Sequence, residues 1–172
     1  MSIHQKGADL YVAATTPTVV AAAGTAPFFL IEGFAAKAIK VHKIIISGPT
    51  LTAVEYLTLV ATKYSTASTG GTATALVAVP LDAKSPASAA TILNVYTVAP
   101  TAGTAIGTVD VRRVLGQATT AAASGLPAIA EFNFTGTEED DCGPVLRGAA
   151  NGFGIRFGAS PATAVTLSLS IL

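Results

Sequence analysis

The residues of this chain that could take part in acid–base, nucleophilic or metal chemistry are few and widely spaced. The two histidines, His4 and His42, lie far apart in the sequence, and the single cysteine, Cys142, follows four acidic residues. Negative charges beside a thiol raise its pKa and suppress the nucleophilic thiolate. No segment has the spacing of a zinc site, a P-loop, a nucleophile elbow or a dinucleotide-binding loop. The pattern predicts a protein that is not an enzyme, with no catalytic residues, no cofactor and no metal site.

The carboxylates leave two alternatives open. The acidic run Glu138–Asp141 is interpreted as a solvated loop, because consecutive side chains do not converge on one ion as the spaced ligands of a calcium loop do. Ion binding, or a contact with Arg112 and Arg113 of a neighbouring subunit, is the alternative. An enzyme would need a carboxylate pair drawn from Asp82, Asp110 and Glu131, and nothing in the sequence positions one.

The composition points to a protein whose surface is covered in an assembly. Of 172 residues, 51% are hydrophobic and only 12% are charged, with 10 basic and 10 acidic side chains. Such a chain has little field with which to attract nucleic acid or an anionic membrane. Its zero net charge and positive mean hydropathy make a lone monomer poorly soluble. The N-terminus lacks the apolar core of a signal peptide, and no apolar run is long enough to span a bilayer.

Short alternating runs separated by turn residues predict about eight strands and no long helix. Their expected ranges are 39–47, 54–64, 73–79, 92–98, 106–115, 130–134, 153–157 and 164–172. In the run 106–115, Gly107, Val109, Val111 and Leu115 alternate with polar residues, so half of this strand should face water or a polar partner. The last run is nearly ideal, with Val165, Leu167, Leu169 and Ile171 on one face.

Turn signals predict how these strands connect. Gly48 and Pro49 should end the first strand, and Gly70-Gly71 should join the runs 54–64 and 73–79 as a hairpin. Asn151-Gly152 is typical of a tight turn between Val145–Leu146 and the next strand. Ser85 and Pro86 have the residue types of a helix start, which would begin one short turn.

The predicted fold class is all-β, an antiparallel β-sandwich of the jelly-roll kind with an extended N-terminal arm. The arm covers residues 1–30 and the sandwich covers residues 31–172. The arm is rich in Thr, Val and Pro, which disfavour helix. It could be an edge strand of the chain's own sheet or a segment laid over a neighbouring subunit. In the second case its contact residues would be Leu10, Tyr11, Val12, Val19, Val20, Phe28 and Phe29.

Three segments carry a resemblance to a known family: TKYSTASTGGTATALVAVPLDAKSPASAATILNVYTVAPTAGT, VLRGAANGFGIRFG and the terminal VTLSLSIL. Together they resemble small structural proteins of tailed bacteriophages that coat or cement the head, across roughly residues 40–172. The resemblance implies a β-sandwich that sits as a homotrimer on the capsid exterior and locks major capsid protein subunits together. It carries over no individual functional residues, because such proteins act through surfaces.

The sequence therefore predicts a capsid decoration protein, located on the virion and assembled in the host cytoplasm. Its expected partners are the major capsid protein and further copies of itself, with no nucleic acid and no membrane. The alternative is a tail or fibre module that binds a cell-surface glycan, although glycan sites favour exposed aromatic rings and only 6% of the residues are aromatic.

Overall fold

The computed structural model describes residues 9–86, 92–119, 128–135 and 143–172. These residues form fourteen strands and no helix. In chain order the strands are β1 (Tyr11–Ala14), β2 (Thr18–Val20), β3 (Pro27–Glu32), β4 (Ile39–Lys40), β5 (Lys43–Leu51), β6 (Glu55–Tyr64), β7 (Thr72–Ala75), β8 (Val79–Pro80), β9 (Ile92–Val98), β10 (Ala105–Ala118), β11 (Ile129–Asn133), β12 (Val145–Leu146), β13 (Gly152–Phe157) and β14 (Val165–Ile171).

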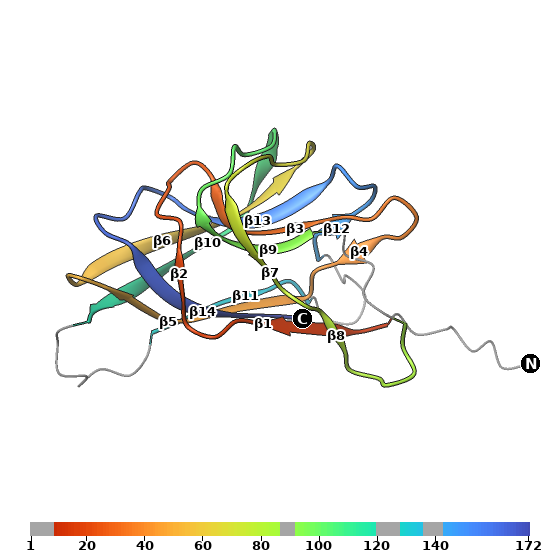
Figure 1. Ribbon diagram of the computed structural model, residues 1–172, viewed down its shortest axis with the longest axis horizontal. Helices are drawn as coiled ribbons and strands as arrows, with labels where there is room; N and C mark the ends of the chain where they lie inside the picture. The colour runs from red at the N-terminus through yellow and green to blue at the C-terminus, as the bar shows by residue number, and fades with distance from the viewer. Residues whose placement is uncertain (1–8, 87–91, 120–127, 136–142) are drawn as a thin grey trace, which may run out of the picture.

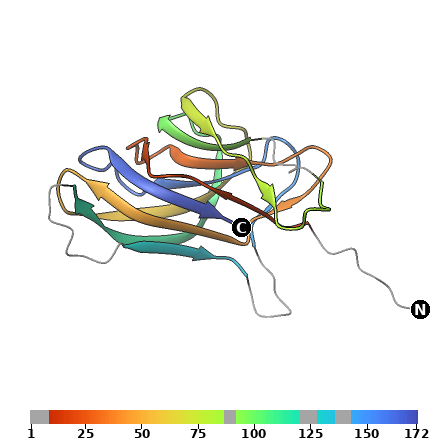
Figure 2. The ribbon, with the colours of Figure 1, turned by 60° about the horizontal axis from the view of Figure 1, so that its bottom comes forward.

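Twelve of these strands belong to one curled sheet, and β12 and β4 form a separate pair. Hydrogen bonds connect the path β7-β9-β3-β13-β6-β10-β5-β14-β1-β8, while β11 pairs with β5 and β2 with β14. Figure 1 shows that the sheet curls over itself, with β3 and β13 in its upper half and β5, β11 and β14 in its lower half, and Figure 2 shows the same curl after a turn of 60°. The junction of β10 with β5 is parallel, whereas the other pairings are antiparallel.

The all-β prediction is confirmed, but the jelly-roll sandwich is not confirmed. The parallel junction makes the sheet mixed, and its strands form one hydrogen-bonded path. Five predicted strands appear with nearly the expected bounds: β6, β9, β11, β13 and β14. On β14 the residues Val165, Leu167, Leu169 and Ile171 are all buried, as their alternation predicts.

The core fills the space between the two halves of the curled sheet. Phenylalanine rings from both halves meet there: Phe134, just after β11, lies edge-on to Phe153 of β13 with ring centroids 5.4 Å apart. Phe28 of β3 and Phe157 of β13 are also in contact, at 4.6 Å. Burial of these large apolar side chains supplies the main force that holds the halves together.

The prediction of an N-terminal arm is wrong for the described residues of that segment, 9–30. β1 and β2 both pair with β14, and β3 lies between β9 and β13, so these residues belong to the chain's own sheet. All six residues of β3 are buried, as expected for a strand covered on both faces. The boundary expected after residue 30 falls inside this strand. Of the two alternatives that the sequence left open, the structure has the intramolecular one.

Two predicted hairpins are also wrong, because in each case other strands occupy both edges of the expected partner strand. Gly70 and Gly71 do make a turn, with φ of 69° and 77°, but β7 then pairs with β9 because β10 and β13 occupy both edges of β6. Likewise β12 pairs with β4, since β3 and β6 occupy both edges of β13. The left-handed residue before β13 is Gly148, with φ of 85°.

Gly48 and Pro49 do not end the first predicted strand. β5 continues through them to Leu51, because Gly48 adopts a left-handed conformation with φ of 62°. The register with β14 shifts by one residue at this point, between the pairs Thr50–Thr166 and Ser47–Ser168. Gly48 thus makes a β-bulge, which inserts one residue while the strand goes on. The short helical turn expected after Ser85 falls mostly on residues 87–91, outside the described residues.

Candidate interaction surfaces

Most of the histidine, cysteine and acidic residues that the sequence singled out for possible chemistry lie outside the described part of the chain. His4, Cys142 and the acidic run Glu138–Asp141 lie outside the described residues. His42 is half-buried between β4 and β5, and its backbone N–H donates to the carbonyl oxygen of Leu172 at 2.9 Å. No three side chains of His, Cys, Asp or Glu in the described ranges are placed to share a metal ion.

The three carboxylates considered for acid–base work each have a partner of their own. Asp82 accepts the backbone N–H of Lys84 at 2.9 Å, which stabilises a tight turn. Asp110 forms an ion pair with Arg112 at 2.8 Å on β10. Glu131 forms one with Lys43 at 2.8 Å, between β11 and β5. These contacts account for all three residues as local structural groups.

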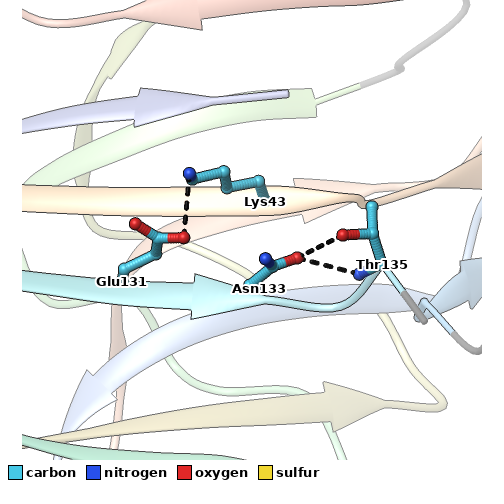
Figure 3. Close-up of polar contacts among 4 residues, drawn as sticks. All are labelled: Lys43, Glu131, Asn133 and Thr135. Carbon is cyan, nitrogen blue, oxygen red and sulfur yellow. Dashed lines mark hydrogen bonds and ion pairs between the residues drawn. The ribbon is translucent and has the colours of Figure 1, made fainter. Parts of the chain in front are cut away.

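The surface of β11 around Glu131 is polar and open to water. Figure 3 shows the Lys43–Glu131 ion pair beside Asn133, whose side-chain oxygen accepts both the N–H and the hydroxyl of Thr135. Both members of the ion pair are substantially exposed, so its contribution to stability is small. This surface has the composition of an ordinary solvated strand pair.

One buried acidic residue, Glu32, was not identified from the sequence. Glu32, at the end of the apolar run of β3, is only 2% exposed and accepts the backbone N–H of Ser68 at 2.9 Å. The Ser68 hydroxyl in turn accepts the N–H of Gly103 at 3.1 Å. Burial raises the pKa of Glu32, and the Ser68 hydrogen bond partly offsets this. Glu32 therefore fixes two loops to the sheet. The feature of the sequence that could have identified it is a charged residue at the end of an apolar run.

A cavity of about 590 Å³ opens between β1, β4 and the end of β14. Apolar side chains make most of its wall, among them Leu10, Val12, Ile39 and Leu93. Its size falls in the range of small-molecule sites. Its lining includes charged residues of both signs, namely Asp9, Lys37 and Lys40, so charge does not indicate one class of ligand.

The most unusual surface of the molecule lies along β10. This strand is far longer than the usual five or six residues, and it pairs with β6 from Ala105 to Gly116. Its apolar side chains Ile106, Val109, Val111 and Leu115 are exposed, and Tyr56 of β6 lies opposite Leu115. We call these five residues the β10 patch. Arg113 lies between Val111 and Leu115 on the same face, and its guanidinium is 4.5 Å from the centroid of the Tyr56 ring.

The alternation in β10 predicts that Val109, Val111 and Leu115 share one face and that the polar face is the one exposed to water. Instead Val114 and Gly116 face the core, against Leu57 and Leu51, while Val111 is 51% exposed. Register shifts at Ala105/Gly107 and Thr108/Asp110 add residues to the first half of β10, whereas its register with β6 is continuous from Asp110 to Gly116. A sequence pattern cannot distinguish an exposed apolar face from a buried one, so the β10 patch was missed.

A second apolar surface lies around β8. Val77, Val79 and Leu81 are exposed at alternate positions, and Leu10 is bound to Leu81 through a backbone hydrogen bond of 2.9 Å. We call these four residues the β8 patch. Val77 is 79% exposed, the most of any large apolar side chain in the described residues. The β8 patch borders the cavity, because Leu10 and Ala78 line it.

The predicted assembly contacts separate into two groups. Leu10 and Val19 are exposed, and Tyr11 and Val12 are half-buried beside the β8 patch. Val20, Phe28 and Phe29 lie in the chain's own core, so they are not available to a partner. The sequence therefore indicated part of one surface, through Leu10, and none of the other.

No family model, curated protein or solved structure matches this chain. Among the residues that the structure describes, no helix has the length and apolarity needed to span a bilayer.

Proposed function

We propose that this protein is a structural virion protein that decorates a bacteriophage capsid and stabilises it by bridging major capsid protein subunits. The observation that carries the proposal is the pair of exposed apolar surfaces, the β10 patch and the β8 patch, on a chain with few charges. Contiguous exposed apolar patches mark sites of protein association. A subunit that bridges two neighbours needs two separate contact surfaces.

The two patches are well placed for this role. In the strand order, β5, β14 and β1 separate β10 from β8, so one subunit presents the patches on different parts of its sheet. The rigid sheet between them would hold the two contacts at a fixed spacing. The phage-protein resemblance supports the identity of the partner, and the jelly-roll sandwich that it implies stays part of the proposal.

The β8 patch is the proposed capsid contact. It includes Leu10, and Tyr11 and Val12 flank it on β1. Exposed Val77 and Leu81 would bury most of their apolar surface on binding, at roughly 25 cal/mol per Å² removed from water. Because this patch has no charged member, capsid binding is expected to persist at high salt.

The test is co-sedimentation of the purified protein with undecorated capsids of the phage that encodes it. Val77→Glu with Leu81→Glu should abolish co-sedimentation, since two charges would have to be desolvated at the contact. Val54→Glu is the matched control, because Val54 is equally exposed but lies in the turn between β5 and β6, outside both patches. Normal decoration by the double variant would contradict the proposed contact. Failure of the parent protein to bind capsids, together with binding on a glycan array, would favour a tail or fibre module instead.

A further inference from the structure

The long strand β10 has one paired edge and one open edge. Its paired edge faces β6 over the whole stretch from Ala105 to Gly116. On the other side, β5 pairs only with Gln117 and Ala118, and β11 comes close to β10 without pairing with it. No other described strand pairs with the stretch before Gln117. Figure 1 shows β10 descending along β6 to the lower left, where it meets β5. An open edge of this length with apolar side chains is a template for another strand.

Within this edge, the segment from Asp110 to Arg113 is the part suited to pairing. The two bulges lie before it, and its register with β6 is continuous through Gly116. The backbone N–H of Val111 donates to the side-chain oxygen of Asp110 at 2.7 Å. A side chain thus satisfies the amide at the middle of the segment, and a carbonyl of an added strand could replace it.

Charge decides which partner and which register fit this edge. When two copies of one strand pair antiparallel about a twofold axis, the residue on the axis faces its own copy, and its two neighbours face each other. An axis at Val111 places Asp110 of each copy opposite Arg112 of the other copy. An axis at Asp110 or at Arg112 would place like charges opposite each other, which is destabilising.

We propose that two copies of this chain associate through antiparallel pairing of β10 with β10 about a twofold axis at Val111. The Asp110–Arg112 ion pair within each copy becomes part of a four-member network of alternating charge across the axis. Val111 meets Val111 of the second copy at the centre, and the two sheets join into one continuous sheet. This association uses β10, and each copy keeps its β8 patch for the proposed capsid contact, so the dimer carries the two contact surfaces that bridging requires.

Disulfide cross-linking tests the register directly. In a Cys142→Ser background, Val111→Cys should form a cross-linked dimer on mild oxidation, because opposite Cα atoms lie about 4.5–5.5 Å apart in an antiparallel pair. Val109→Cys is the matched control, with nearly the same exposure, 45% against 51%. In the proposed register its two copies would be four residues apart along the strands, or roughly 13 Å, beyond the reach of a disulfide.

Charge exchange gives a second, independent measurement. Asp110→Arg alone and Arg112→Asp alone should each raise the dimer dissociation constant about tenfold or more, measured by sedimentation equilibrium. The double variant Asp110→Arg/Arg112→Asp restores opposite charges across the axis and should return within about threefold of the parent. Circular dichroism of each variant checks that the sheet remains folded.

The proposal is overturned if the parent protein is monomeric at tens of micromolar, or if native mass spectrometry gives three copies, as the resemblance to phage head proteins implies. Cross-linking at Val109 as efficient as at Val111 would equally overturn it. Each of these results leaves the capsid co-sedimentation test unaffected, so the two proposals can fail separately.

Discussion

Gly154 of β13 offers a sharp test of the packing in the upper half of the sheet. A Cβ atom added to Gly154 would lie 2.6 Å from the carbonyl oxygen of Phe29 and 3.0 Å from Cβ of Pro27. The first of these is a backbone atom of β3, which pairs with β13 along this stretch. Relief of the clash would require β3 to shift, together with the fully buried Phe29 and Leu30.

The expected magnitude follows from two opposing effects. Overpacking in a close-packed interior costs about 1–3 kcal/mol. Replacement of glycine by alanine also restricts the unfolded chain, which stabilises the folded state by about 0.4–1 kcal/mol. We therefore expect Gly154→Ala to lower the free energy of unfolding by up to about 2.6 kcal/mol. For a chain of this length, that corresponds to a fall in Tm of up to about 10 °C.

Gly152 of the same strand is the matched control. A Cβ atom there would meet Leu30, Tyr64 and Glu32 at 3.4–3.7 Å, which is ordinary van der Waals contact. Gly152→Ala should therefore raise the free energy of unfolding by about 0.4–1 kcal/mol through the unfolded chain. Urea denaturation, with the midpoint and slope fitted separately, measures both variants. Equal stability of the two variants, or a greater loss for Gly152→Ala, would refute the close approach of β3 and β13.

Three further predictions follow from the structure. Because burial raises the pKa of Glu32, the folded protein holds this proton more tightly than the unfolded chain, and stability falls as the pH rises from about 4.5 through the folded-state pKa. Glu32→Gln keeps the acceptor for the Ser68 N–H. The midpoint of its urea denaturation should therefore not fall with rising pH in this range, and at pH 7 it should equal or exceed the midpoint of the parent protein. Deletion of residues 1–30 removes β1, β2 and part of β3, so the remainder should show no cooperative thermal transition by circular dichroism, and a normal transition would show that these strands are dispensable. Lys43→Ala should lower the free energy of unfolding by no more than about 1 kcal/mol at low salt. A larger loss that disappears in 1 M salt would mean that the exposed Lys43–Glu131 ion pair contributes more than expected.

The sequence by itself determined the fold class and many of the elements. Alternation of apolar and polar residues placed β14 and β13, and their apolar faces are buried as expected. This succeeds because side-chain direction alternates along any strand, whatever its neighbours are. The scarcity of charge likewise pointed to association before any surface was known.

Only the tertiary structure decided which strands pair and which apolar faces remain open. Local turn residues predicted hairpins for β7 and β12, but the edges of β6 and β13 were already occupied by strands distant in sequence. Competition for a strand edge is a long-range property that no local pattern contains. In the same way, Val109 and Val111 of β10 have the alternation of a buried strand and yet are exposed, because the opposite face of the strand, with Val114 and Gly116, is the one that packs against the core. The sequence thus led us to propose that this protein associates, and the pairing of its strands decided which apolar surfaces are exposed.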